Sequence, residues 1–204
     1  ESATAPEQGV MANINVNTID VDAWGRVLSG ASGAPIAAGD PPAGAAANPA
    51  LNYLPTILAV RARELSVEGR TLHNVVVGGS REGLVWRANL DARELNGYLE
   101  YRQPSGAGAG RVYARLARLS IAAAEASEVE RLLDQQPASI PALDVVVDDL
   151  ELRGKRLGRV EIDAVNRGGA AVAREGGVRE WRLNKLNVSM PEATFNATGN
   201  WAAL

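Results

Sequence analysis

The sequence predicts a mainly β protein, α+β by content, whose curved antiparallel meander sheets are built from two repeats, each with one short helix. The prediction rests on an alternation of apolar and polar residues that recurs along the chain. From Leu143 to Leu157 the alternation is interrupted by Asp148 and Asp149 and then resumes. Period-two alternation is typical of a half-buried strand. We therefore expect a bulge or bend at the two aspartates that keeps all the apolar side chains on one face.

Five copies of this kinked pattern can be found, the last one shorter. Their apolar residues are Ala12, Ile14, Val16, Ile19 and Val21; Leu58, Val60, Ala62, Leu65 and Val67; Val112, Ala114, Leu116, Leu119 and Ile121; Leu143, Val145, Val147, Leu150 and Leu152; and Trp181, Leu183, Leu186 and Val188. Recurrence with the interruption at the same place indicates internal repeats.

The first repeat is expected over residues 10–103. It begins with a kinked strand, continues with a short helix near residues 22–28, and then enters an Ala/Gly/Pro-rich linker over residues 29–48. A second kinked strand follows, with returning strands that start near Leu72, Leu84 and Gly97 and turns at Gly69–Arg70 and Gly78–Gly83. The short connections predict an antiparallel meander in which neighbours pair in order.

The second repeat is expected over residues 110–204. A kinked strand leads to a helix at about residues 125–135, where Ser127 and Glu130 have the spacing of a capping box. A second meander follows, with a Gly/Ala-rich turn at Gly168–Gly177. Its residues Leu150–Leu157 correspond to Leu65–Leu72 of the first repeat, and Trp181–Arg182 corresponds to Trp86–Arg87.

Composition excludes several classes of function. Hydrophobic residues make up 46% of the 204 and charged residues 22%, which is ordinary for a folded protein. The net charge of −3 and the lack of a basic cluster argue against nucleic acid as a partner. The chain has no cysteine, which excludes disulfides and Cys-based zinc sites. No apolar run approaches the ~20 residues that span a bilayer.

No residue set points to catalysis, and we expect no enzyme activity, catalytic residue, metal site or cofactor. His73 is the only histidine and has no nucleophile motif beside it, so we expect an exposed structural side chain. Asp144, Asp148, Asp149 and Glu151 are expected on the solvent face of a strand. The glycine clusters do not have nucleotide-binding spacing, and we interpret them as hairpin turns. A glycosidase would need two convergent acids in a cleft.

The apolar strand faces remain as the candidate site. In a closed sandwich two such sheets would cover each other; an open, curved sheet would instead offer an elongated apolar groove that suits acyl chains. Both possibilities stay open at this point. The residues expected to line this core or groove are Leu65, Val67, Val75, Val77, Trp86, Leu150, Leu152, Val160, Ile162, Trp181 and Leu183.

Three runs resemble the C-terminal region of the AsmA-like YhdP family of Gram-negative bacteria. They are LELRGKRLGR at Leu150–Arg159, EWRL at Glu180–Leu183 and PEATFNATGNW at Pro191–Trp201. The resemblance implies a large periplasmic cell-envelope protein, anchored in the inner membrane, whose repeating β-groove lets phospholipid pass to the outer membrane. It also implies a fragment from which the anchor is absent.

The leading hypothesis is therefore a fragment of a bridge-like periplasmic protein that supports phospholipid transport between the inner and outer membranes through an apolar β-groove. The expected partners are phospholipid acyl chains, the remainder of the full-length chain and envelope proteins. The alternative is a non-catalytic structural or protein-interaction module in envelope assembly, in which the apolar faces are closed.

Overall fold

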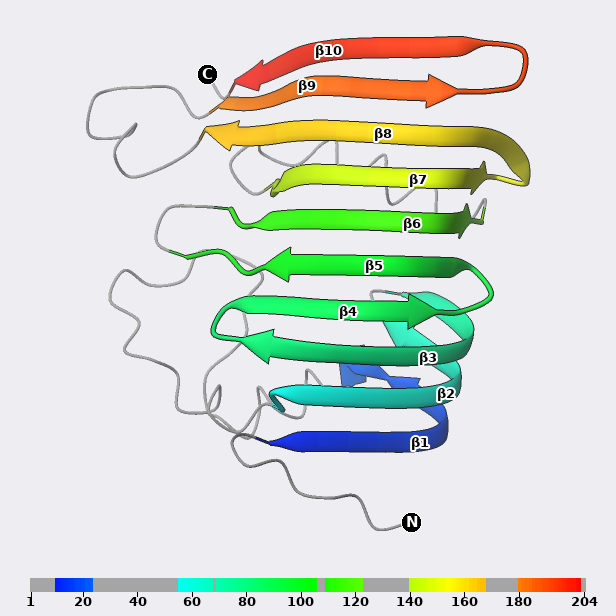
Figure 1. Cartoon of the computed structure of the whole chain (residues 1–204), viewed down its shortest axis with the longest axis vertical. Coiled ribbons are helices and arrows are strands. Elements are labelled where there is room, and N and C mark those ends of the chain that lie inside the picture. Colours follow the sequence, from blue (N-terminus) through cyan, green and yellow to red (C-terminus); the bar gives the residue numbers. More distant parts are fainter. Residues whose placement is uncertain are drawn as a thin grey trace.

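The computed structural model describes residues 10–23, 55–67, 69–105, 109–122, 140–167 and 180–202. Its ten strands form one sheet in which the order of the strands follows the order of the sequence (Figure 1). The strands are β1 (Met11–Asp20), β2 (Ile57–Val67), β3 (Arg70–Glu82), β4 (Val85–Asp91), β5 (Leu95–Arg102), β6 (Arg111–Ile121), β7 (Ala142–Leu152), β8 (Lys155–Arg167), β9 (Glu180–Ser189) and β10 (Thr194–Ala202). The prediction of a mainly β protein is confirmed.

Strand direction has the same pattern in both halves of the sheet. β1 and β2 are parallel, as are β6 and β7, whereas every other neighbouring pair is antiparallel. The antiparallel run from β2 to β5 is the meander expected from its short connections. The sheet continues without a break from β5 to β6, so both halves belong to one layer. The division into units at residues 10–103 and 110–204 stays a prediction.

The kink is visible as a residue missing from the strand pairing. Asn17 and Arg63 have no partner between β1 and β2, and Asn74, at φ 55°, has none between β2 and β3. In the second half the skipped residues are Ala117 and Asp148. In Figure 1 the right-hand ends of β1, β2 and β3 bend away from the viewer.

In the second half the apolar residues before and after the kink lie on the same face of the sheet, as predicted. Leu119 and Leu150, which follow the skipped residues, pack against a buried cluster of Ala114, Leu116 and Val147. Without the extra residue in each strand, side chains three positions apart would lie on opposite faces. The bulge thus lets one strand present apolar residues to the same face on both sides of the bend.

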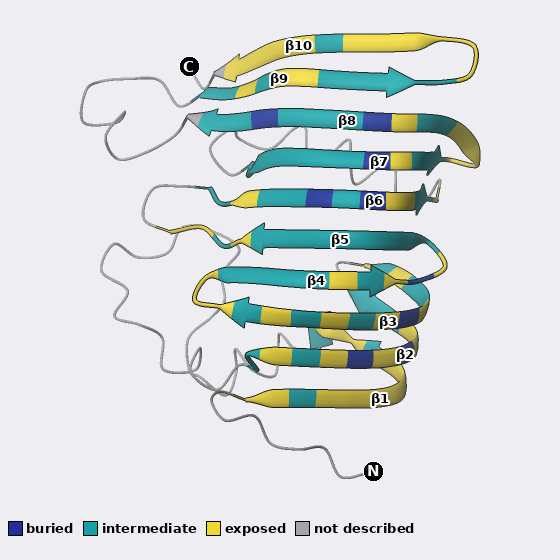
Figure 2. Cartoon of the chain, viewed as in Figure 1, coloured by how far each residue is buried: buried dark blue, intermediate teal, exposed yellow. Residues whose placement is uncertain are grey.

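Burial is concentrated in the middle of the sheet (Figure 2). The buried hydrophobic residues are Val60, Ala62, Val75, Ala92, Ala114, Leu116, Val147, Val160 and Ala164, and no polar residue is buried in the described part of the chain. Among the described elements, strands with extensive contacts are always neighbours in the sheet. The described strands therefore form a single open layer rather than the closed sandwich considered above.

Two boundaries differ from the sequence-based expectation. Gly78 and Gly79 were expected in a turn but lie inside β3, and that connection turns instead at Gly83, at φ 57°. A Cβ on Gly79 would lie 2.8 Å from the Arg87 carbonyl oxygen, so this glycine allows close approach of β3 and β4. β5 begins at Leu95 rather than near Gly97.

Several expected elements fall outside the described residues. The linker at residues 29–48, the helix at about 125–135 and the turn at Gly168–Gly177 lie there entirely. Of the helix expected near residues 22–28, only residues 22 and 23 are described, in a helical turn over 21–23. The Ala23 amide donates to Asp20 Oδ1 at 2.8 Å, as a helix N-cap does.

Candidate functional site

One face of the sheet carries a row of apolar side chains that crosses all ten strands. In register, its members are Ile14, Val60, Val77, Leu90, Gly97, Leu116, Val147, Val160, Val188 and Phe195. Each is directly opposite the next, and Gly97 alone has no side chain. We call this the long row.

A second row runs beside it, two residues along each strand and therefore on the same face. Its members are Ala12, Leu58, Gly79, Ala88, Leu99, Ala114, Val145, Ile162, Leu186 and Ala197. Neither row contains a charged or hydrogen-bonding side chain. The two rows define the apolar face, which has no polar group that would fix a ligand at one place along it.

The eleven residues predicted from sequence mostly lie on this face. Val77 and Val160 belong to the long row and Ile162 to the second row. Val75, Trp86, Trp181 and Leu183 lie two or more residues further along the same strands, and Leu150 packs with the central cluster. Leu65, Val67 and Leu152 lie beyond the kinks, near strand ends, and pair with Leu72, Arg70 and Lys155. That these residues line a lipid path stays a prediction.

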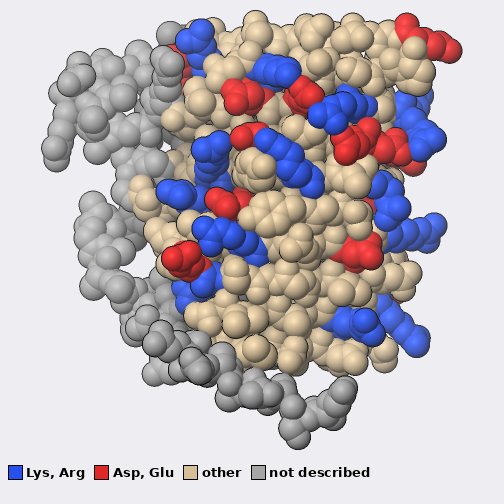
Figure 3. Space-filling model, in the orientation of Figure 1, with Lys and Arg blue, Asp and Glu red and all other residues tan. Residues whose placement is uncertain are grey.

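Charged side chains gather on the opposite face, over the middle strands in Figure 3. Because this face is toward the viewer and the sheet bends away, the apolar face lies on the inside of the bend. Arg115 of β6 donates to Asp144 Oδ1 of β7 at 2.7 Å, and its guanidinium lies 4.1 Å from the ring of Tyr113. Tyr98 and Tyr113 pack edge to face, with ring centroids 6.1 Å apart. We call the side of the sheet that carries these residues the charged face.

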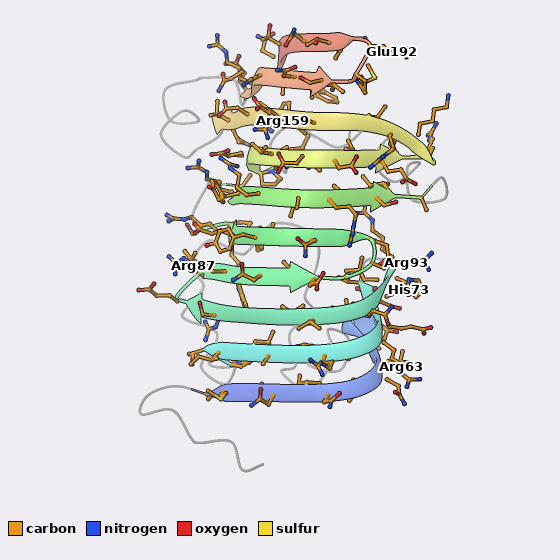
Figure 4. All side chains as sticks on the ribbon, turned by 45° about the vertical axis from the view of Figure 1, so that its right-hand side comes forward. Arg63, His73, Arg87, Arg93, Arg159 and Glu192 are labelled. Carbon is orange, nitrogen blue, oxygen red and sulfur yellow. The ribbon has the colours of Figure 1, made fainter. Side chains whose placement is uncertain are left out.

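Ion pairs link neighbouring strands across the charged face. Arg159 pairs with Asp148 and Glu161, and Lys185 pairs with Glu161 from β9. Hydrogen bonds from Lys185 and then Arg159 lower the pKa of Glu161. Arg87, labelled in Figure 4, pairs with Glu82 and Glu100. The side chains of these pairs are partly to largely exposed to solvent, and ion pairs of this kind contribute little to stability.

The lone histidine is half-buried rather than exposed. His73 lies at the bend of β3 beside Asn74, and its ring Nδ1 lies 2.7 Å from Glu94 Oε1. Its backbone amide donates to Glu94 Oε2 at 2.8 Å. This pairing uses both carboxylate oxygens, which points to a structural role. Within the described ranges, no group of three His, Cys, Asp or Glu side chains could hold a metal ion.

Two shallow depressions lie beside Gly97 on the charged face. One, of about 380 Å³, is lined by Asn89, Asp91, Asn96 and Tyr98 among others. The other is lined by Arg115, Asp148 and Arg159, all of which are already paired. Neither has the convergent acids or nucleophile that hydrolysis requires.

The sequence-based set left out residues that complete the apolar face. Ile14, Leu116, Val147 and Phe195 are members of the long row. Three of them were visible as alternating residues of the kinked strands, so pairing each strand in order with its neighbours would have found them. Phe195 lacked that signal because β10 was not recognised as an alternating strand.

Comparison with known proteins identifies one family. The model of the family described as YhdP protein matches residues 1–203. No curated protein matches the chain significantly, and no solved structure does. In the part of the chain that the structure describes, no helix has both the length and the apolar character needed to span a bilayer.

Proposed function

Because the chain belongs to the YhdP family, we propose that it is a module of a bridge-like periplasmic protein that supports phospholipid transport between the inner and outer membranes. In this proposal the apolar face shelters the acyl chains, and the charged face is turned to water. The module acts without catalysis and without a cofactor. Its partners are phospholipid and the remainder of a longer chain.

The observation that carries the proposal is the long row. Burying an acyl chain contributes roughly 0.8 kcal/mol per methylene group, wherever along the face it lies. On the long row Val60 lies opposite Val77 and Val147 lies opposite Val160, and the neighbouring strands that carry each pair are about 4.8 Å apart. A chain that leaves one position therefore meets an equivalent one beside it. Such a face favours sliding over tight binding at one site.

The contrast between the two faces also supports the proposal. Adjacent residues of β3 illustrate it: Val77 faces Val60 and Leu90, whereas Val76 faces Arg61 and Asp91. A module that served only as a spacer would need no uninterrupted apolar row across ten strands. The long row is exposed at its two ends, where Ile14 is 37% and Phe195 is 52% exposed, and exposed apolar surface is typical of ligand, partner or membrane contact.

The test compares these adjacent valines. The purified chain, Val77→Asp and Val76→Asp are each extracted with organic solvent, and the phospholipid is quantified by mass spectrometry. A carboxylate in an acyl-chain site costs several kcal/mol, so Val77→Asp should lower bound phospholipid at least about tenfold. Val76→Asp controls for the loss of strand propensity and should retain the wild-type amount.

Either of two results would count against the proposal. Wild-type chain that carries no phospholipid and takes up no fluorescent acyl probe would favour the structural or protein-interaction alternative. Equal lipid in the two variants, with circular dichroism showing both folded, would place the lipid elsewhere. If Val77→Asp fails to fold, Ile162→Asn in the second row, with Asp163→Asn on the charged face as its control, asks the same question.

A further inference from the structure

The first of the two depressions beside Gly97 is bounded by side chains from three neighbouring strands. It measures about 380 Å³, which is near the lower end of the roughly 300–1,000 Å³ typical of small-molecule sites. Two register rows of the charged face meet in it: Gly78, Asn89 and Tyr98 in one, and Val76, Asp91 and Asn96 in the other. β3, β4 and β5 thus bring two amides, a carboxylate and a phenol together.

The floor of this depression is low and uncharged. A Cβ placed on Gly78 would meet no atom within 4 Å, so the space above this glycine is open. Val76 beside it exposes 42% of its surface. In Figure 3 the surface over the middle of β3 and β4 is mostly uncharged. A ligand lying here would touch apolar surface and hydrogen-bonding groups at the same time.

The polar groups offer both donors and acceptors. Asn96 Nδ2 donates to Asp91 Oδ1 at 3.0 Å, and this hydrogen bond orients both side chains across β4 and β5. The second carboxylate oxygen of Asp91 can accept from a ligand. Asn89 makes no side-chain hydrogen bond within the described residues, and its amide can donate twice and accept. Together these groups can bind neighbouring hydroxyl groups of one ligand.

The ring of Tyr98 is held in place from two sides. Its hydroxyl donates to Glu100 Oε2 at 3.5 Å, and its ring packs edge to face with Tyr113. The Arg115 guanidinium lies 4.1 Å from the Tyr113 ring and supports this arrangement. A fixed aromatic ring offers a ligand a broad apolar surface at little cost in conformational entropy.

The charges around the depression restrict the class of ligand. Among the described lining residues Asp91 is the one charged side chain, and none is Lys or Arg. A phosphate or carboxylate ligand would meet a like charge with no cation to offset it. Calcium takes roughly six to eight oxygen ligands, usually from several carboxylates, and finds one carboxylate here. The site therefore suits a neutral ligand that has hydroxyl groups on its edge and an apolar face.

We propose that this depression binds a neutral sugar, as a pyranose ring. Asn89, Asp91 and Asn96 hydrogen-bond to its hydroxyl groups, and the ring of Tyr98 contacts its C–H face. Gly78 admits the sugar because any larger side chain would occupy the floor. The site lies on the charged face, opposite the apolar face, so the proposal does not depend on the proposed lipid role.

Nuclear magnetic resonance of the nitrogen-15-labelled chain tests the proposal. The probes are the methyl pyranosides of glucose, mannose, galactose and N-acetylglucosamine, each raised to about 30 mM, where weak specific binding is populated. At least one should shift the side-chain amide signals of Asn89 and Asn96 along a saturable curve. Glycerol, which has hydroxyl groups but no ring, and inorganic phosphate, an anion, should leave these signals in place.

Two variants locate the binding. Asn89→Ala should weaken the affinity for the bound sugar at least about fivefold, followed through the Asn96 amide, because it removes hydrogen bonds to the ligand. Asn196→Ala is the matched control and should bind as wild type, since Asn196 is exposed in the same register row but lies on β10. Gly78→Leu should abolish binding, and its thermal unfolding should show that the sheet is intact.

Four results would overturn the proposal. The first is the absence of a saturable shift with all four sugars. The second is an equal shift with glycerol or with phosphate, which would indicate a general solvent effect or an anion site. The third is sugar binding that is lost on addition of a chelator, which would mean that a metal ion holds the ligand. The fourth is wild-type affinity in Asn89→Ala or in folded Gly78→Leu, which would place the sugar elsewhere.

Discussion

Glu94 holds His73 by both carboxylate oxygens, one 2.7 Å from the ring Nδ1 and the other accepting from the backbone amide at 2.8 Å. The two residues are 21 positions apart, and the contact joins the bend of β3, where Figure 4 labels His73, to the turn between β4 and β5. The Ser120 amide of β6 donates to the Glu94 carbonyl at 2.7 Å. One glutamate thus connects the bent part of the first half to the first strand of the second.

This contact predicts a specific loss of stability in acid. Partial burial tends to raise the pKa of Glu94, but hydrogen bonds from the His73 amide and ring outweigh it, so the pKa is lowered from its ordinary 4.5. The stabilisation is complete above the unfolded-state pKa and is lost as the pH falls through the folded-state value. Glu94→Gln should lower the free energy of unfolding by roughly 1–2 kcal/mol at pH 7.

Urea denaturation between pH 3 and pH 7 measures this effect. The difference between wild type and Glu94→Gln should shrink toward the acid end of the range, because protonation removes the same charge. Asp91→Asn, at an exposed position in the same hairpin, serves as the control. A difference that does not change with pH would mean that the Glu94 charge is not what stabilises the bend.

Burial separates two adjacent valines in β3. Val75 is 1% exposed on the apolar face, whereas Val76 is 42% exposed on the charged face. Val75→Ala should therefore cost roughly 1–3 kcal/mol, and Val76→Ala no more than about 0.5 kcal/mol. Chemical denaturation of both variants measures the difference. Equal costs would mean that the apolar face does not contribute more to stability than the charged face.

Gly97 is predicted to be the glycine least tolerant of a side chain in the inner strands. Its φ is 146°, and a Cβ there would lie 2.3 Å from the Arg115 carbonyl oxygen, whereas a Cβ on Gly78 meets nothing within 4 Å. Gly97→Ala should destabilise the chain by about 2–4 kcal/mol. Gly78→Ala should be neutral within about 0.5 kcal/mol. Thermal unfolding of the pair tests this, and similar midpoints would show that β5 and β6 can separate locally without cost.

Substitutions on the charged face should affect stability without affecting lipid. Asp144→Asn removes the charge that Arg111 and Arg115 share. We expect a loss of about 1 kcal/mol and an unchanged amount of co-purified phospholipid. Loss of phospholipid from the folded Asp144→Asn variant would assign the headgroup or the whole lipid to the charged face.

Much of the strand layout follows from the sequence because period-two alternation is a local signal. The interruption at Asp148 predicted a kink, and Leu150 does return to the face of Val147. Strand direction, in contrast, cannot be predicted from this alternation. Alternation is the same in either direction, so the parallel pairing of β6 with β7 depends on the path of the connection and has no local signature.

Contacts between distant residues were the least accessible to sequence reading. The partner of His73 is set by the bend at Asn74 and by the β4–β5 turn together, so no motif around the histidine points to Glu94. Gly78 and Gly79 were mistaken for a turn because paired glycines are common in both settings. What distinguishes them is the approach of Arg87 from the next strand.

The agreement between strand order and sequence order has a consequence for how the protein folds. Each strand pairs with the strand before it, so no strand must wait for a distant partner except across the two long connections before β2 and β7. Contacts of low sequence separation form rapidly. The sheet can therefore grow one strand at a time from its first hairpin, and each added strand provides an unpaired edge to which the next strand can form hydrogen bonds.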